Sequence, residues 1–152
     1  MKNNQKLLQC LFETKIIALE KSSLFDIAVK PKSSDFDFDK VEGMLLGLAI
    51  GDSLGNTSES MVPSERKGLY GETRDYWPNP RAEFEPLGVP SDDTQLAFWT
   101  LEHLLEQNGL APDHLAEIFS TNRIFGIGST VLRFIRNMRS GTPWYECGPR
   151  LE

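Results

Sequence analysis

Glycine recurs at every fourth position in the most apolar stretch of this chain. The stretch runs from Val41 to Leu54, has helical spacing, and carries no charge between Glu42 and Asp52. The repeating glycines lie in it or directly after it: Gly43, Gly47, Gly51 and Gly55. A glycine inside a helix costs about 1 kcal/mol relative to alanine, so the repeat requires a compensating contact. We expect a buried helix over 41–54 whose glycine ridge lets another helix or a ligand approach closely.

The other long periodic segments are also helical. We predict helices over the ranges 4–20, 95–107, 112–121 and 129–139. The second of these ends at Asn108-Gly109, a common helix terminator, and the third has Pro112 near its first turn. No segment alternates apolar and polar residues over more than a few positions, as a half-buried strand would. The sequence therefore predicts an all-α fold.

Composition limits the classes of partner. The net charge of −6 argues against a general nucleic-acid or anionic-membrane surface. The longest apolar run is far shorter than the roughly 20 residues that span a bilayer, and the N-terminus lacks the pattern of a signal peptide. The two cysteines, Cys10 and Cys147, lie near opposite ends of the chain, which fits a reducing compartment. We expect a cytoplasmic protein with no nucleic-acid or membrane partner.

The segment Ser91-Asp92-Asp93-Thr94 follows Pro90 and directly precedes an apolar helical run. Two functions are open to such a carboxylate pair. It can cap the helix, because side-chain oxygens accept hydrogen bonds from the free N–H groups of the first turn. It can also bind a hard cation such as Mg²⁺. With only two histidines in the chain, any metal site must use carboxylates, which favours Mg²⁺, Mn²⁺ or Ca²⁺ over zinc.

Two further acidic residues follow the apolar helix. Asp52 is predicted at its C-terminal end, where the helix dipole disfavours a negative charge, so this carboxylate needs a hydrogen-bonding or cationic partner. Glu59 follows seven residues later in a polar stretch. Farther on, residues 61–90 are rich in Pro, Gly and aromatic residues, and a loop this long is often functional. Glu83 and Glu85 in that loop are further candidates to complete a site.

Residues 30–39 form a polar linker, which divides the chain into an N-terminal helical extension with its linker (1–39) and a main domain (40–152). The glycine pair in 125–130 precedes the last helix, and such an N-terminus can hold an anion, although the glycine-lysine pattern of a phosphate loop is absent. We expect a solvated face from the three arginines of that helix: Arg133, Arg136 and Arg139.

Together, three segments resemble the ADP-ribosylglycohydrolase family, which includes the dinitrogenase-reductase-activating glycohydrolases. Residues 47–59, with Asp52 and Glu59, match the pattern G-x-A-x-G-D-[AS]-x-G-x-x-x-E. Residues 91–94 match [ST]-D-D-[ST], and residues 125–130 look like the family's segment after the second helix pair. The resemblance covers roughly residues 41 to 147.

This resemblance implies an orthogonal all-α domain, about twice as long as residues 41–152, whose cleft holds two Mg²⁺ or Mn²⁺ ions. It implies Ser91, Asp92 and Asp93 as metal ligands and Glu59 as the catalytic glutamate, while Asp52 is taken as architectural. The implied reaction is hydrolysis of the N- or O-glycosidic bond of ADP-ribose, attached to a modified protein or contained in a small molecule. An oxocarbenium-like transition state is expected.

The family's later D-x-D-[ST] segment has no counterpart after Asp93. The only Asp-x-Asp pattern lies in 35–39, ahead of the domain. We therefore expect 40–152 to be the N-terminal half of the family's domain, with the C-terminal half absent. A Mg²⁺ ion takes about six oxygen ligands, so we expect weak or partial metal binding and a weakly active or inactive chain. Uncovered apolar helix faces would favour self-association.

Two other functions stay open. The chain could be a non-catalytic helical module that acts through self-association or through a partner chain. It could also be a different Mg²⁺-dependent hydrolase, such as a phosphohydrolase, that uses the same Asp92–Asp93 pair. Release assays on ADP-ribosylated protein and on phosphate esters would separate these hypotheses.

Overall fold

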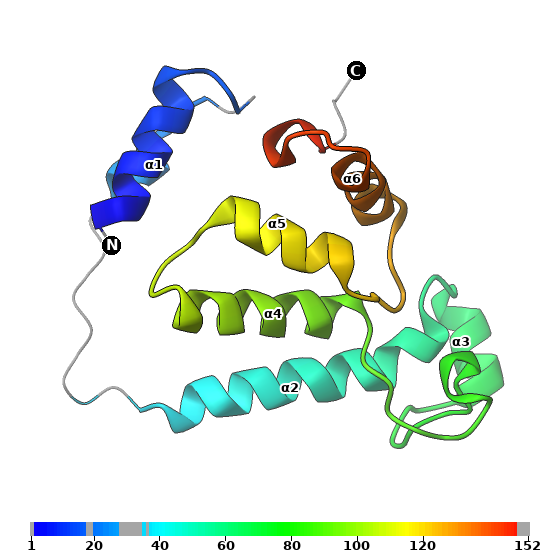
Figure 1. Ribbon diagram of the computed structural model, residues 1–152. Helices are drawn as coiled ribbons and strands as arrows, with labels where there is room; N and C mark the ends of the chain where they lie inside the picture. The colour runs from blue at the N-terminus through cyan, green and yellow to red at the C-terminus, as the bar shows by residue number, and fades with distance from the viewer. Residues whose placement is uncertain (1, 18–19, 28–34, 36, 149–152) are drawn as a thin grey trace. The chain divides into compact units, whose positions relative to one another are not determined.

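The computed structural model describes residues 2–17, 20–27, 35 and 37–148, and every regular element in that part of the chain is a helix (Figure 1). The α-helices are α1 (Lys2–Glu13), α2 (Asp39–Gly55), α3 (Pro63–Tyr70), α4 (Asp92–Glu106), α5 (Pro112–Thr121) and α6 (Ser129–Arg139). The short 3₁₀ helices are η1 (Ser23–Asp26), η2 (Asn56–Ser58), η3 (Pro80–Ala82) and η4 (Trp144–Glu146). The all-α prediction is confirmed.

The chain divides into two compact units, which are described separately. The first comprises Met1–Phe36, Trp99–Asn122 and Gly128–Glu152, and the second comprises Asp37–Phe98 and Arg123–Ile127. The boundary passes through α4, so its N-terminal turns belong to the second unit. The sequence-based division into 1–39 and 40–152 stays a prediction.

The helix predicted over 4–20 is shorter than expected, because α1 ends at Glu13. The Thr14 N–H still donates to the Cys10 carbonyl oxygen at 2.9 Å. Lys15 then takes a left-handed φ of 54°, which a continuing α-helix does not allow. Residues 18 and 19 of the predicted range lie outside the described residues.

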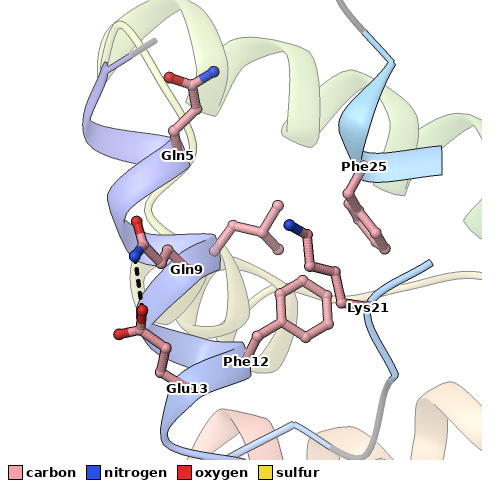
Figure 2. A pocket seen from close by; sticks show the side chains of 7 residues that line it. Gln5, Gln9, Phe12, Glu13, Lys21 and Phe25 are labelled. Atoms are coloured by element: carbon pink, nitrogen blue, oxygen red, sulfur yellow. Dashed lines mark hydrogen bonds between the residues drawn. The ribbon is translucent and has the colours of Figure 1, made fainter. Parts of the chain in front are cut away.

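A face of α1 with both polar and apolar side chains borders a hollow of 560 Å³ in the first unit. The Phe12 ring meets the Phe25 ring edge-on, with their centroids 5.1 Å apart. Figure 2 shows the side chains around this hollow, with the Gln9–Glu13 hydrogen bond of 2.7 Å on its α1 side. The lining residues are Gln5, Leu8, Gln9, Phe12, Glu13, Lys21 and Phe25.

Helix α5 packs on α6 in the first unit. The Trp99 ring of α4 lies 6.4 Å from the Phe119 ring of α5. Arg139 Nε donates to the Ser120 carbonyl oxygen at 2.8 Å. One of the three arginines expected on a solvated face therefore ties α6 to α5.

His103, in the last turn of α4, is fully buried. Its Nε2 accepts the Ala111 N–H at 2.9 Å, and its Nδ1 lies 3.2 Å from Nδ1 of His114. A backbone N–H can only donate, so Nε2 carries no proton and the neutral His103 ring holds its proton on Nδ1. That proton is then donated to His114. Both histidines therefore act as structural hydrogen-bonding groups.

In the second unit, α2 is more exposed than the sequence predicts. An added Cβ at any of the four ridge glycines would meet no atom within 4 Å: Gly43, Gly47, Gly51 and Gly55. Met44, Leu46 and Ile50 on the same helix are 63%, 54% and 50% exposed. Within the described residues of the second unit, the expectation of a buried helix closely approached by another helix is therefore wrong, because glycine spacing permits close approach without supplying the neighbour. No helix in this part of the chain is both long and apolar enough to cross a membrane.

The stretch 61–90 is more ordered than a plain loop, because it contains α3 and η3. Pro63 opens α3 at its first positions, where proline fits a helix. The Tyr70 and Trp77 rings lie 5.0 Å apart. Gly88 approaches Tyr76 so closely that an added Cβ would lie 2.6 Å from the ring. Aromatic contacts therefore anchor this stretch.

Candidate functional site

Asp52, near the end of α2, binds the start of α4 through a cluster of hydrogen bonds. Its Oδ1 accepts the Ser91 Oγ–H at 2.6 Å. Its Oδ2 accepts the Ser91 N–H at 2.7 Å and the Thr94 Oγ1–H at 2.6 Å. The Thr94 N–H reaches the same Oδ2 at 3.3 Å. Four donors from one turn therefore converge on one carboxylate.

This carboxylate caps α4 from a different helix. The first N–H groups of a helix have no partner inside it and favour a nearby negative charge. Asp52 lies at the unfavourable end of α2, and the N-terminus of α4 compensates for that position. The prediction that Asp52 needs a hydrogen-bonding partner is confirmed, whereas its architectural role stays a prediction.

Asp92 and Asp93 lie in the first turn of α4 but do not cap it. Among the described residues, neither side chain accepts a backbone N–H, and the Thr94 N–H donates to Asp52 instead. The capping interpretation of the pair does not hold, because Asp52 already occupies the capping position. Both carboxylates remain free for other ligands.

The pKa of Asp52 lies below its ordinary value. Partial burial would by itself raise this pKa, but the hydrogen bonds from Ser91, Thr94 and Asn56 together outweigh burial. Asp52 is therefore a stable anion, and it is a poor choice for a proton-transferring group at neutral pH.

Two asparagines connect this cluster to the long stretch between α3 and α4. Asn56 Nδ2 donates to the Val89 carbonyl oxygen at 2.6 Å and to Asp52 Oδ1 at 3.3 Å. Buried Asn79 donates through Nδ2 to Asn56 Oδ1 at 3.1 Å and accepts the Arg81 N–H at 2.9 Å. Sequence analysis missed both, because asparagine is common in turns and carries no distinctive spacing.

A hollow of 350 Å³ opens beside the cluster. Three of the four predicted site residues line it, namely Glu59, Ser91 and Asp93. Asp92 is half-buried and does not line the hollow. The other lining residues are Leu48, Gly51, Asp52, Gly55 and Asn56. The Glu59 N–H donates to the Asn56 carbonyl oxygen at 3.4 Å, so η2 joins Glu59 to the Asp52 cluster.

Gln95 holds the segment 123–127 against the start of α4. Its Oε1 accepts the Phe125 N–H at 2.8 Å, and its Nε2 donates to the Arg123 carbonyl oxygen at 3.1 Å. The next residue, Gly126, has a φ of 70°. An added Cβ there would lie 3.0 Å from Ser91 Cβ, so this position requires glycine. The first glycine of the sequence pair therefore packs on a predicted site residue, whereas anion binding at this segment stays a prediction.

Several side chains that line this hollow carry the type of oxygen atom that binds a hard cation. Hydroxyl and carboxylate oxygens are the ligands that Mg²⁺ and Mn²⁺ prefer. Their number is small, since no group of three or more His, Cys, Asp or Glu side chains in the described ranges could hold a metal ion. Additional oxygen ligands or waters would be needed to complete an octahedral site.

Comparison with known proteins adds independent information. Residues 33–150 match the family model described as ADP-ribosylglycohydrolase. An uncharacterized protein from Archaeoglobus fulgidus is 32% identical over 116 residues, which make up 72% of this chain and 37% of that protein. The chain thus spans a little over a third of the length of this relative.

Proposed function

Because the chain belongs to the ADP-ribosylglycohydrolase family, we propose that it carries part of a site that hydrolyses the N- or O-glycosidic bond of ADP-ribose. The substrate would be an ADP-ribosylated protein or a small molecule that contains ADP-ribose. The observation that carries this proposal is the hollow at which Glu59, Ser91 and Asp93 come together beside the Asp52 cluster.

Ser91, Asp92 and Asp93 would contribute oxygen ligands to Mg²⁺ or Mn²⁺. When bound, such ions supply positive charge that orients hydroxyl groups and water. The small number of ligands supports weak or partial metal binding by these residues alone. Further ligands from outside them would complete the site of an active enzyme, so we propose that the 152-residue chain is weakly active or inactive by itself.

Glu59 would act at the substrate as a base or as a gate to the site. Its side chain is exposed on the hollow, and its backbone is joined to η2, so it can approach a ligand without first breaking a buried contact. Asp52 is unsuited to the same role, because its carboxylate is already occupied by donors from Ser91 and Thr94.

A non-catalytic function has one observation in its favour. The exposed apolar residues of α2 could support self-association or docking on a partner chain. This alternative would explain a stable fold that lacks turnover.

The first test is metal binding to the purified chain. We expect Mn²⁺ to raise the melting temperature and Asp92→Asn to abolish that rise, because a ligand that binds only the folded state stabilises it. Asp113→Asn, which changes a carboxylate in the first turn of α5, is the matched control and should keep the response. A response that survives Asp92→Asn would place the metal elsewhere.

The second test compares release of ADP-ribose from modified protein with release of phosphate from esters. We expect no measurable release of ADP-ribose from the isolated chain with Mg²⁺ or Mn²⁺. Turnover by a monomer, abolished by Glu59→Gln, would show that the chain is a complete enzyme. Activity on phosphate esters alone would favour a phosphohydrolase instead.

A further inference from the structure

Asp52 fixes the direction of the Ser91 hydroxyl proton. A serine hydroxyl has one proton, and an ionised carboxylate can only accept it. Ser91 Oγ lies 2.6 Å from Asp52 Oδ1, so that proton points at Asp52. Thr94 donates its own hydroxyl proton to Oδ2 of the same carboxylate.

The Ser91 hydroxyl therefore has only its lone pairs left to offer a ligand in the hollow. Ser91 is 3% exposed and lines the hollow together with Asp93 and Glu59. Gly126 packs against Ser91 Cβ and limits rotation of the side chain. With its proton already donated, Ser91 can accept a hydrogen bond or bind a cation, but it cannot donate to an acceptor such as a phosphate oxygen.

We propose that Asp52 is a positioning residue, which orients Ser91 Oγ so that a divalent cation in the hollow meets a neutral oxygen with its lone pairs exposed. This inference rests on the proposed function, because it assigns Asp52 a role in the same site. A residue that orients a metal ligand through a hydrogen bond influences affinity without touching the metal.

The substitution Asp52→Asn tests the inference sharply. The backbone N–H groups of Ser91 and Thr94 both donate to Oδ2, so the amide oxygen of an asparagine must take that position. The amide NH₂ then replaces Oδ1 and donates to Ser91 Oγ. The Ser91 proton is thereby released toward the hollow, where it opposes a cation.

The matched control is Thr94→Val. It removes one hydroxyl that donates to Oδ2 and leaves the bond between Oδ1 and Ser91 intact. Thr94 does not line the hollow. If the Asp52 cluster were purely structural, both substitutions would weaken Mn²⁺ binding alike. If Asp52 positions Ser91, only Asp52→Asn affects metal binding.

Two readouts separate this inference from the proposed function. In a mixture of H₂O and D₂O, the Ser91 Cβ signal in a carbon NMR spectrum should split, because a slowly exchanging hydroxyl carries either isotope. Binding of Mn²⁺, followed by electron paramagnetic resonance, should weaken about 10- to 100-fold in Asp52→Asn and stay unchanged in Thr94→Val. Circular dichroism confirms that each variant is folded.

An unsplit Ser91 signal in the wild-type chain overturns the inference, as does Mn²⁺ binding by folded Asp52→Asn that equals the wild type. Absence of Mn²⁺ binding by the wild type overturns the proposed metal site, and the positioning role falls with it. Should Asp52→Asn fail to fold, the isotope splitting of the Ser91 Cβ signal in the wild-type chain decides the matter, because it reports the Ser91 hydroxyl proton without any substitution.

Discussion

In the described structure, polar side chains occupy several of the best-buried positions, among them Asn79, Ser91, Thr94 and His103, and each of these four has a defined partner. Asp52 accepts donors from Ser91 and Thr94, Asn79 joins the long stretch to α2, and His103 accepts the Ala111 N–H. A buried polar group that loses its partner costs about 1–3 kcal/mol. At the scale of single residues, stability should therefore depend on these hydrogen bonds.

Asp52→Ala should destabilise the chain by about 1–2 kcal/mol at neutral pH, as expected for loss of a helix cap. The folded pKa of Asp52 lies below the unfolded value of 3.8, so its contribution is complete above that value and is lost as the pH falls through the folded pKa. Urea unfolding at pH 7 and near pH 3 should show the difference between variant and wild type shrinking in acid. The control is Asp75→Ala, since the hydrogen bond of the Asp75 carboxylate within the described structure comes from the N–H of its neighbour Tyr76, and this substitution should destabilise the chain less at neutral pH.

His103→Leu should destabilise the chain by about 1–3 kcal/mol, because the Ala111 N–H loses its acceptor in a buried place. His114→Leu removes only the contact between the two Nδ1 atoms and should cost less. Denaturant unfolding measures both values. Nitrogen NMR of the wild type should find the His103 proton on Nδ1, and a proton on Nε2 would contradict the hydrogen-bond assignment.

At the scale of elements, glycines have different roles in α2 and in the segment 123–127. The ridge glycines of α2 have no atom near an added Cβ, so their backbone conformation does not need glycine. Gly126 has a φ of 70°, and a Cβ added there would lie 2.9 Å from the Arg81 side chain and 3.0 Å from Ser91 Cβ. Within the described structure, glycine is therefore required at position 126 and only tolerated on the ridge of α2.

Gly47→Ala should stabilise the chain by up to about 1 kcal/mol, because alanine has the higher helix propensity and meets no steric obstacle. Gly126→Ala should destabilise it, because alanine disfavours positive φ and would press on Ser91. Thermal unfolding of the two variants measures whether each substitution stabilises or destabilises the chain. Destabilisation by Gly47→Ala would show that another surface packs on the ridge, as the sequence pattern suggests.

At the scale of the whole molecule, few apolar side chains are well buried. The buried apolar residues of the described part are small or medium in size: Ala116, Ile135 and Cys147. Larger ones on α2 remain exposed, as do Leu105 on α4 and Leu69 on α3. Exposed apolar patches commonly mark surfaces that bind another chain.

We therefore expect the purified chain to self-associate or to bind a hydrophobic dye. Sedimentation velocity over a range of concentrations measures the association directly. The double variant Met44→Lys and Ile50→Lys should reduce it, since charge opposes apolar contact on the same helix. Lys40→Glu changes charge on α2 without altering an apolar residue and serves as control. A monomer at all concentrations would contradict the expectation.

Several features could be predicted from the sequence because they depend on local chemistry. The helical period, the helix end at Asn108-Gly109, the helix start at Pro112 and the family motifs all lie within short segments, and the comparison with the family model confirms the resemblance. The need of Asp52 for a partner also followed from its place at a helix end. The metal-ligand roles of Ser91, Asp92 and Asp93 and the catalytic role of Glu59 stay predictions.

Contacts between distant segments were decided by the tertiary structure alone. The partner of Asp52 is 39 residues away at Ser91, and the link from Gln95 to Phe125 spans 30. No local pattern specifies such pairings. A hydrogen-bonding group in a sequence shows that a partner is needed, but it does not show which residue that partner is. The same reason explains the error about the glycine ridge: spacing shows that a surface could approach the ridge, and only the folded chain shows that no described residue of the second unit does so.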